Sequence, residues 1–357
     1  MSAAAGQPTA DPGIGPQLLA VRDLTTRFVI GRREFAAVDG VSFSLDRGTS
    51  MGIVGESGSG KSVLARTIMG LLPGSGVSVS GSAHLNGTEL VAMTGSQRRR
   101  LWGTAIAMVF QDPLTSLNPV MKIGNQVGEA VRAHRKRLDR SEIGRQSLRL
   151  LETVQVPDPG RVAGLYPHEL SGGMRQRVAI AIALAGDPDL LIADEPTTAL
   201  DVTIQAEILD LLEALQAERA MSVILISHDL AVVAGRTDQV AVMYAGKIVE
   251  RGPTAAVFDD TQMPYTQALL NAVPKLDLPS HTQLAAIDGR PPRPDSIPAG
   301  CRFAPRCGYA QPRCQAEAPP ITAGKRAGHE YSCWYPLGSR AVPAADPAHE
   351  LDAGSRA

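Results

Sequence analysis

The chain has 357 residues and a mass of 37.6 kDa, which predicts one large domain with an appendage. Its residues are 44% apolar and 20% charged, close to the globular norm, so disorder of the whole chain is excluded. A net charge of −1 gives no support to bulk binding of nucleic acid. We expect neither a transmembrane helix nor a secretory signal, because the sequence lacks the apolar stretches that both require.

Two kinds of sheet are indicated along the chain. Residues 1–16 are mostly alanine, glycine and proline, and we expect a disordered leader there. Short β-rich runs in residues 18–45 alternate with turn residues, as in an antiparallel sheet. Three brief apolar runs each lie beside a helical pattern, which indicates α/β structure with a mainly parallel sheet and helices on both faces. These runs are residues 51–54, 190–193 and 223–227.

A helical subdomain is expected inside this α/β core. Residues 112–170 are polar, basic and helix-periodic, unlike the segments on either side. Asp139 and Glu142 have the spacing of a capping box, and the pattern that follows places apolar residues on one helix face. We therefore predict that these helices are inserted between strands of the parallel sheet.

The composition changes again after residue 252. Residues 253–337 are rich in proline in their middle part and contain all four cysteines of the chain. We expect a small appended domain there, following a main domain over residues 17–252. Residues 338–357 offer little to bury and are expected to form a tail.

Residues 55–62, GESGSGKS, match the phosphate-binding pattern G-x-x-x-x-G-K-[ST] between an expected strand and an expected helix. The glycines let backbone N–H groups turn towards the phosphates of a nucleotide. Lys61 adds positive charge there, and the Ser62 hydroxyl can bind Mg²⁺. A chance glycine-rich turn would not explain the strand and helix, so we predict a nucleotide site. The residues expected to contact the nucleotide are Ser57, Gly58, Ser59, Gly60, Lys61 and Ser62.

The apolar run over residues 190–193 ends in two acids, Asp194 and Glu195. A buried parallel strand delivers such carboxylates at its carboxyl end, where open α/β sheets bind ligands. Asp194 suits the binding of Mg²⁺, directly or through water, and Glu195 suits the polarisation of an attacking water. A strand that merely ends in solvated acids is the weaker interpretation beside a phosphate motif.

Residues 170–177, LSGGMRQR, narrow the class of nucleotide-binding protein. Here the chain resembles the ATP-binding-cassette (ABC) family, whose LSGGQ-type signature it matches with methionine for the final glutamine. Ser171, Gly172 and Gly173 open a helix whose unpaired N–H groups and positive dipole end suit an anion. The resemblance implies that this anion is the γ-phosphate held by a partner subunit, so the site works only across a dimer.

Further motifs of that family follow in order. Gln111 matches the family's Q-loop, which implies that it senses Mg²⁺ and touches a membrane subunit. Residues 199–201 match the D-loop, and His228 matches the switch histidine that contacts the γ-phosphate. The family also stacks an aromatic ring on adenine, and Phe28 fits that spacing better than Phe35. The implied catalytic residues are Gln111, Glu195 and His228.

The resemblance covers roughly residues 18–335. Stretches such as MVFQDPLTSLNP and GCRFAPRCGYAQPRC resemble, within the family, the subfamily for uptake of dipeptides, oligopeptides and nickel. It implies a P-loop ABC ATPase core with an antiparallel β subdomain, an inserted helical subdomain and a small cysteine-containing C-terminal domain. The implied activity is hydrolysis of ATP, with Mg²⁺, that powers the import of peptides.

The subfamily also implies partners and a location. These partners are a second ATPase subunit, two transmembrane permease subunits and an extracytoplasmic substrate-binding protein. The second ATPase is expected to be a homologous but distinct chain, with a homodimer as the alternative. The chain would then be a peripheral protein on the cytoplasmic side of the cell membrane. Nickel or another small solute is the alternative cargo, and an ABC ATPase without a transport role is the alternative class. Basic runs at 98–100 and 135–137 lack interleaved aromatic residues, so we expect no nucleic-acid partner.

The four cysteines, Cys301, Cys307, Cys314 and Cys333, have the spacing C-x5-C-x6-C-x18-C. Disulfides are disfavoured in a chain without an export signal. Structural zinc usually takes cysteine pairs two to four residues apart, which this spacing lacks. An iron–sulfur cluster takes four thiolates at irregular spacing. Related subfamily members carry a [4Fe–4S] cluster, so the resemblance favours one here over zinc or four unligated thiols.

Overall fold

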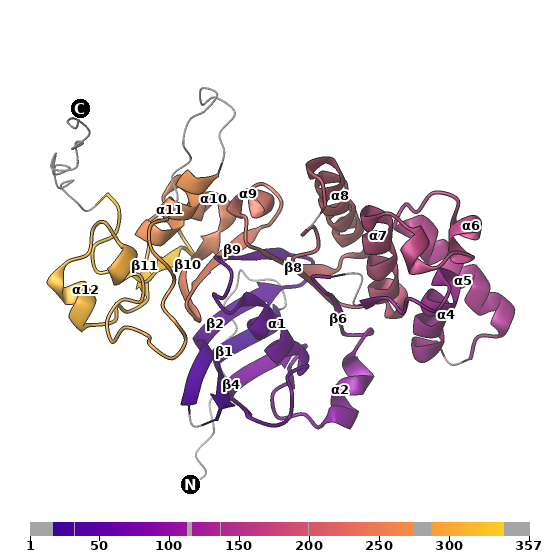
Figure 1. Cartoon of the computed structure of the whole chain (residues 1–357), viewed down its shortest axis with the longest axis horizontal. Coiled ribbons are helices and arrows are strands. Elements are labelled where there is room, and N and C mark those ends of the chain that lie inside the picture. Colours follow the sequence, from indigo (N-terminus) through magenta and orange to yellow (C-terminus); the bar gives the residue numbers. More distant parts are fainter. Residues whose placement is uncertain are drawn as a thin grey trace, which may run out of the picture.

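A computed structural model describes residues 17–31, 33–112, 116–135, 137–198, 200–273 and 287–338. The expected leader, the expected tail from residue 339 onwards and Ala199 of the D-loop motif lie outside the described residues. In the described part, the chain forms two β-sheets with helices packed around them (Figure 1).

The smaller sheet is antiparallel, with its strands in the order β2-β1-β4-β5. Its strands are β1 (Gln17–Ile30), β2 (Arg33–Asp46), β4 (Val77–Leu85) and β5 (Thr88–Glu89). Val41, Phe43 and Leu45 of β2 are buried at every second position, because one face of the sheet packs on the core. The antiparallel sheet that the sequence predicts is therefore confirmed.

The larger sheet has the strand order β11-β12-β10-β9-β3-β8-β7-β6. The strands from β9 to β6 run parallel, and β10, β12 and β11 extend the sheet antiparallel at the other edge. The bounds are β3 (Ser50–Val54), β6 (Ile106–Val109), β7 (Leu190–Asp194), β8 (Ser222–Ser227), β9 (Gln239–Tyr244), β10 (Lys247–Pro253), β11 (Thr322–Ala323) and β12 (Glu330–Tyr331). The three apolar runs of the sequence are thus β3, β7 and β8.

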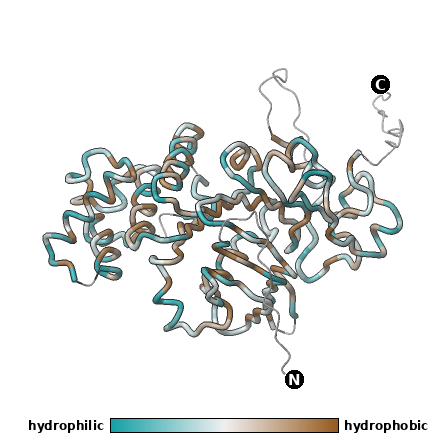
Figure 2. The backbone as a smooth tube through the Cα atoms, turned by 180° about the vertical axis from the view of Figure 1, so that it is seen from behind, coloured by the Kyte–Doolittle hydropathy of each residue, from teal (hydrophilic) through white to brown (hydrophobic). Residues whose placement is uncertain are grey.

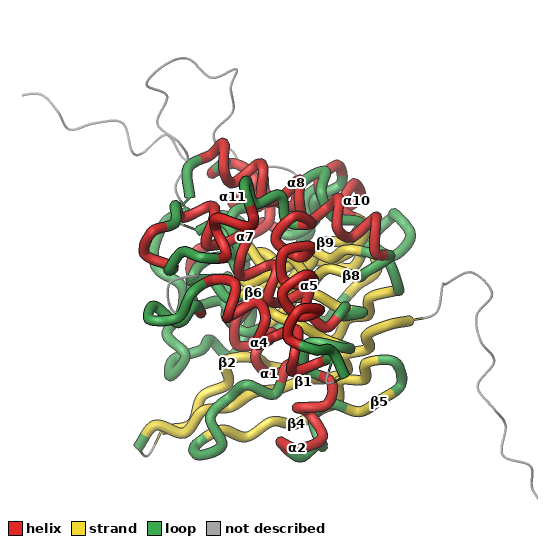
Figure 3. The backbone as a smooth tube through the Cα atoms, turned by 90° about the vertical axis from the view of Figure 1, so that its right-hand side faces the viewer, coloured by secondary structure: helices red, strands yellow, loops and turns green. Residues whose placement is uncertain are grey.

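Helices cover both faces of the larger sheet, and the group α4 to α7 lies at one end of the molecule (Figures 1 and 3). Asp139 caps α5 as the sequence predicts, because its Oδ1 accepts the Glu142 N–H at 2.8 Å. The helix bounds are α1 (Lys61–Met69), α2 (Gly95–Leu101), α4 (Ile123–His134), α5 (Arg140–Thr153), α6 (Pro159–Ala163), α7 (Gly172–Ala183), α8 (Val202–Arg219), α9 (Leu230–Val233), α10 (Thr254–Asp259), α11 (Pro264–Ala272) and α12 (Pro312–Ala316).

The larger sheet separates two hydrophobic cores. Leu190 and Ile192 of β7 join the core that contains the antiparallel sheet and α1. Leu191 and Ala193, which point to the opposite face, join the core that contains α7, α8 and the helical insertion. Burial on both faces explains why these strands are continuous apolar runs in the sequence. Figure 2 accordingly shows the centre of the larger sheet in mostly hydrophobic colours.

The C-terminal segment is built into this sheet. β12 pairs with β10, so that Tyr331 lies opposite Glu250. The rings of Tyr244, Tyr265 and Phe303 pack together with centroids 4.5 to 5.3 Å apart, and all three side chains are buried. The segment that composition marks as appended therefore shares both sheet and core with the α/β domain.

A buried polar contact between Glu250 and His329 joins the C-terminal segment to β10. Glu250 and His329 have fully buried side chains, and their Oε1 and Nε2 atoms are 3.0 Å apart. The Glu250 carboxylate also accepts the backbone N–H groups of Gln262 and Met263, at 2.6 and 3.2 Å. One carboxylate thus connects β10, the turn before α11 and the residue that precedes β12.

We predict that Glu250→Ala lowers the melting temperature strongly. Removing the carboxylate leaves His329 and two backbone N–H groups buried without an acceptor, and each such group costs about 1–3 kcal/mol. Calorimetry should show a clear decrease for Glu250→Ala. The control is Glu317→Ala, which removes an exposed pair with Arg313 and should change stability little. Equal melting temperatures for the two variants would contradict the role given to Glu250.

Candidate functional site

The phosphate loop connects β3 to α1 and is made of residues whose backbone favours glycine. Gly60, the residue before α1, has φ +105°, and a Cβ there would lie 2.3 Å from the carbonyl oxygen of Ala37. A Cβ at Gly55 would lie 2.1 Å from the carbonyl oxygen of Met243. The glycines of the motif are therefore required both by backbone conformation and by close contact with neighbouring strands.

Lys61 lies within this loop. Its Nζ donates to the carbonyl oxygens of Gly55 and Glu56, at 2.6 and 3.1 Å, and the residue is buried. Burial lowers the pKa of Lys61, while the carboxylates of Glu195 and Asp194 oppose that shift. The ammonium thus lies between the loop and the acids at the end of β7, where a phosphate group would meet it.

Asp194 ends β7 and contacts the start of α1. The Ser62 hydroxyl donates to Asp194 Oδ1 at 2.8 Å. Asp194 Oδ2 is buried and has no hydrogen-bond partner among the described residues. Burial raises the pKa of Asp194, and the hydrogen bond from Ser62 opposes this shift. A buried carboxylate oxygen without a partner beside a hydroxyl is an arrangement that fits a hard cation.

Glu195 is the centre of a second group of side chains. Its Oε2 accepts hydrogen bonds from Gln111 Nε2 at 2.8 Å and from Thr198 Oγ1 at 2.9 Å, and lies 3.4 Å from His228 Nδ1. Glu195 has φ +48°, a conformation that residues with a Cβ rarely adopt. The structure therefore brings together the three side chains for which the sequence predicts catalytic roles.

Thr198 is a residue of this group that the sequence interpretation missed. Its position three residues after Glu195 is the only signal in the sequence, since that spacing lets a hydroxyl reach back to the acid in a turn. The backbone N–H of Thr198 also donates to the carbonyl oxygen of Glu195 at 3.2 Å.

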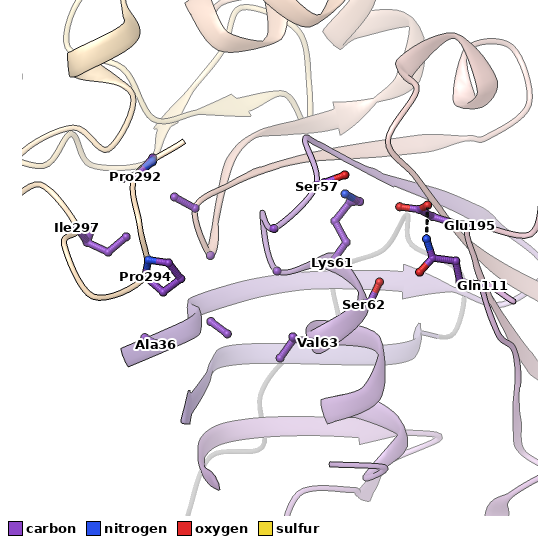
Figure 4. A pocket seen from close by; sticks show the side chains of 15 residues that line it. Ala36, Ser57, Lys61, Ser62, Val63, Gln111, Glu195, Pro292, Pro294 and Ile297 are labelled. Atoms are coloured by element: carbon purple, nitrogen blue, oxygen red, sulfur yellow. Dashed lines mark hydrogen bonds between the residues drawn. The ribbon is translucent and has the colours of Figure 1, made fainter. Parts of the chain in front are cut away.

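One pocket connects the phosphate loop to the Glu195 group. Figure 4 shows Gln111 and Glu195 at one end, Lys61 and Ser62 in the middle, and side chains of the C-terminal segment at the other end. Those C-terminal residues are Pro292, Pro294 and Ile297, which the sequence interpretation also missed.

The aromatic pair Phe28 and Phe35 does not belong to the pocket lining. Phe28 and Phe35 stack on each other with centroids 5.7 Å apart and an angle of 19° between the rings. Neither is among the residues that line the pocket, whereas Ala36 and Ala37 are. The stacking of Phe28 on adenine stays a prediction.

Comparisons with known proteins connect these features to a family. The ABC transporter family model matches residues 38–198, and the oligopeptide/dipeptide transporter C-terminal region matches residues 249–314. The oligopeptide transport ATP-binding protein OppD of Haemophilus influenzae is 46% identical over 317 residues, covering 89% of this chain and 97% of that protein. The chain belongs to the ABC transporter ATPases. The dipeptide transport ATP-binding protein DppD of Escherichia coli is 45% identical over 91% of this chain and 99% of its own length.

Solved structures of ABC cassettes have the same fold as this ATPase. The dimeric cassette MJ0796, in a post-hydrolysis state bound to ADP and Pi, matches with a TM-score of 0.60 and 26% identity, covering 66% of this chain and 99% of that one. CbiO1 of Clostridium perfringens matches with a TM-score of 0.58 and 29% identity, covering 68% and 91%. The α/β core that the sequence predicts, with its antiparallel and helical subdomains, is confirmed.

An ABC ATPase uses ATP with Mg²⁺, and the residues present fit both. The fit to Mg²⁺ rests on Ser62 Oγ and the buried Oδ2 of Asp194, which are oxygen atoms of the kind that this ion prefers. When bound, the ion neutralises charge between the β- and γ-phosphates. The fit to the triphosphate rests on the glycine loop and Lys61.

The signature residues of this ABC ATPase lie apart from its own pocket. Ser171 caps α7, and its Oγ accepts the Met174 N–H at 3.3 Å. A Cβ at Gly173 would lie 2.6 Å from Ile204 of α8, so the glycine permits close packing of the two helices. None of the signature residues Ser171, Gly172 and Gly173 lines the pocket that contains Lys61.

The predicted iron–sulfur cluster in the C-terminal segment is contradicted. Among the described residues, which include all four cysteines, no group of three or more His, Cys, Asp or Glu side chains is arranged to hold a metal ion. Burial raises the pKa of the Cys301 thiol, which disfavours the thiolate that a metal binds. None of Cys301, Cys307, Cys314 and Cys333 is in a disulfide, and all four pack in or against the hydrophobic core. The prediction of a [4Fe–4S] cluster was therefore wrong, and so was the zinc alternative.

We predict that Thr198→Val slows ATP hydrolysis about tenfold without changing the Kd for ATP. A hydrogen bond to a charged group contributes about 1.5–3 kcal/mol, and its loss leaves the Glu195 carboxylate less well oriented. Steady-state hydrolysis and equilibrium ATP binding would be measured separately. The control is Thr203→Val, at an exposed position of α8, which should leave both the hydrolysis rate and the Kd for ATP unchanged. Unchanged kcat in Thr198→Val would show that the hydroxyl does not orient Glu195.

Proposed function

We propose that this ABC ATPase powers the import of peptides through a membrane permease. The observation that carries the proposal is similarity over nearly the whole chain to proteins named for oligopeptide and dipeptide transport. This similarity includes the C-terminal segment, which matches the oligopeptide/dipeptide transporter region as well as the cassette. Because that second region lies outside the cassette, it supports a peptide transporter more specifically than the ATPase fold does.

In the proposed mechanism the pocket holds ATP with its phosphates at the glycine loop. Lys61 would exchange its backbone partners for the β- and γ-phosphates, and Ser62 and Asp194 would hold the Mg²⁺ ion. Glu195 orients the attacking water and accepts its proton, since it lies at the γ-phosphate end of the pocket. Gln111 and His228, which both approach the Glu195 carboxylate, complete that end.

A second subunit would complete the site. The signature residues Ser171 and Gly172 lie at the N-terminus of α7, where unpaired backbone N–H groups favour an anion. They do not line the pocket of their own chain, so we propose that they act on the γ-phosphate held by the partner. The similar cassette MJ0796 is described as a dimer, which supports this arrangement.

The proposed complex contains a second, homologous ATPase, two transmembrane permease subunits and an extracytoplasmic substrate-binding protein. Among the helices that the structure describes, none combines the length and the hydropathy of a membrane span. We propose that the chain is attached to the cytoplasmic side of the membrane through the permease subunits. Nucleic acid is not a proposed partner.

We predict that Glu195→Gln retains ATP binding while hydrolysis falls by at least about 100-fold, as expected when a water-orienting base is lost. Lys61→Ala should instead weaken ATP binding itself, because it removes the positive charge from the loop. Uptake of a labelled dipeptide by vesicles that contain the complex should stop in both variants. Identical Kd values for ATP in the two variants would contradict this division of roles. Continued dipeptide uptake would contradict the proposed function.

We also predict that Ser171→Arg inactivates the site of the opposite subunit. In a complex with an unmodified partner ATPase, the site with this chain's own Lys61 should stay competent and the partner's site should fail. Labelling of each subunit by a photoreactive ATP analogue under turnover conditions would distinguish the two sites. Ser96→Arg, an exposed serine in the first turn of α2, is the matched control. Failure at the Lys61 site instead would refute the arrangement in trans.

A further inference from the structure

We propose that Pro292, Pro294 and Ile297 form the wall of the ATP site on the side of the ribose and base. We further propose that Arg306 is a positioning residue, which joins this wall to the phosphate loop. The inference rests on the proposed ATP site and adds the C-terminal segment to it. Residues 287–298, which carry the wall, are named the C-terminal arm.

The position of the arm along the pocket supports the first part. Lys61, Gln111 and Glu195 mark the end where the γ-phosphate lies. Figure 4 shows Pro292, Pro294 and Ile297 on the other side of the phosphate loop, across from Glu195. A nucleotide whose phosphates follow the loop towards Glu195 therefore extends its ribose and base towards the arm.

The chemistry of this end of the pocket suits a planar base. The side chains that line it are apolar, namely Ala36, Ala37, Pro292, Pro294 and Ile297. Apolar surface gains free energy when a base covers it, and two prolines lose little conformational freedom in the contact. Phe28 and Phe35 stack on each other and do not line the pocket. Among the described residues, the arm therefore provides the largest apolar side chains at this end.

Arg306 connects the arm to the phosphate loop. Its guanidinium makes a bidentate pair with the carboxylate of Glu56, at 2.6 and 2.9 Å, and its side chain is 4% exposed. Its remaining N–H groups donate to the carbonyl oxygens of Asp288 and Ile287, at 2.8 and 3.2 Å. A single side chain thus binds the second residue of the loop and the first two residues of the arm.

Glu56 is held from two sides by C-terminal residues. Its carboxylate binds Arg306, and its backbone N–H donates to the hydroxyl of Tyr265 at 2.9 Å. The carbonyl oxygen of Glu56 accepts a hydrogen bond from Lys61 Nζ. A shift of Glu56 would therefore move the phosphate loop. It would also move the carbonyl oxygen that binds Lys61 Nζ.

The surroundings of Arg306 fix its orientation. The guanidinium lies 5.8 Å from the ring centroid of Tyr244 and 5.9 Å from that of Phe303. The hydrogen bonds to Glu56 raise the pKa of Arg306, in keeping with a tightly bound ion pair. A lysine could not replace this arginine, because an ammonium group does not reproduce the planar fork that binds Glu56 and the arm together.

The first experiment separates the base side of the pocket from the phosphate side. Using the full chain with Mg²⁺, Kd would be measured for ATP and for inorganic tripolyphosphate, which has no ribose or base. The variant Pro292→Ala/Pro294→Ala/Ile297→Ala should raise the Kd for ATP about tenfold and leave that for tripolyphosphate within about twofold. Pro291→Ala/Pro298→Ala is the matched control, because these arm residues line a neighbouring cavity instead.

The outcomes distinguish the wall from the proposed function. An unchanged Kd for ATP in the wall variant would overturn the first part of the inference, and so would equal weakening for both ligands. The proposed ATP site itself would be contradicted if the unmodified chain bound neither ATP nor tripolyphosphate. It would also be contradicted if Lys61→Ala raised the Kd of neither ligand.

The second experiment tests Arg306 by kinetics. Arg306→Lys should raise KM for ATP about tenfold with kcat within about twofold, because the loop is displaced while Glu195 is unaffected. Glu56→Gln should have the same effect, and the double variant should be no worse than either single one. Arg326→Lys, at an exposed ion pair with Asp259, is the control. A lower melting temperature with unchanged KM would reduce Arg306 to a purely structural residue and overturn its positioning role.

Discussion

The parallel alignment of four strands is the constraint on which the site depends. β3, β6, β7 and β8 all point the same way, so their carboxyl ends meet at one edge of the larger sheet. The phosphate loop follows β3, Gln111 follows β6, Glu195 follows β7 and His228 follows β8. The bond between Ser62 and Asp194, 132 positions apart in the sequence, exists only because this alignment brings the two strand ends together.

The parts of the site that were predictable from sequence are those whose chemistry is local. The glycine loop, the acids after β7 and the cap at Asp139 each depend on a few consecutive residues, so short motifs reveal them. The contact between Glu56 and Arg306 spans 250 positions and depends on the packing of the C-terminal segment, which no short motif records. The cysteines show the converse failure, because neither their spacing nor a family resemblance establishes that thiols gather in a geometry that binds metal.

The phosphate loop and the signature lie in different parts of the chain for a structural reason. The phosphate loop lies on α1, while the signature opens α7, which packs against α8 and the helical insertion. The larger sheet separates these two helices, and the signature residues accordingly do not line the pocket that contains Lys61. Rigid packing of Gly173 against Ile204 also ties the signature to α8, whose start lies shortly after Glu195 in the sequence. If the proposed second subunit binds at the signature, α8 would connect Glu195 to that surface.

The C-terminal arm extends this reasoning to the opposite side of the pocket. If Arg306 holds the arm and the phosphate loop in one arrangement, ATP binding stabilises that arrangement by its differential affinity for it. Thermodynamic reciprocity then requires that anything which displaces the C-terminal segment changes the affinity for ATP by the same factor. The segment shares a sheet with the core through β12 and a buried carboxylate through Glu250, so it has little freedom to move alone. A transport complex that contacts this segment would therefore act on ATP through the short connection from Arg306 to Glu56, and not through the fold as a whole.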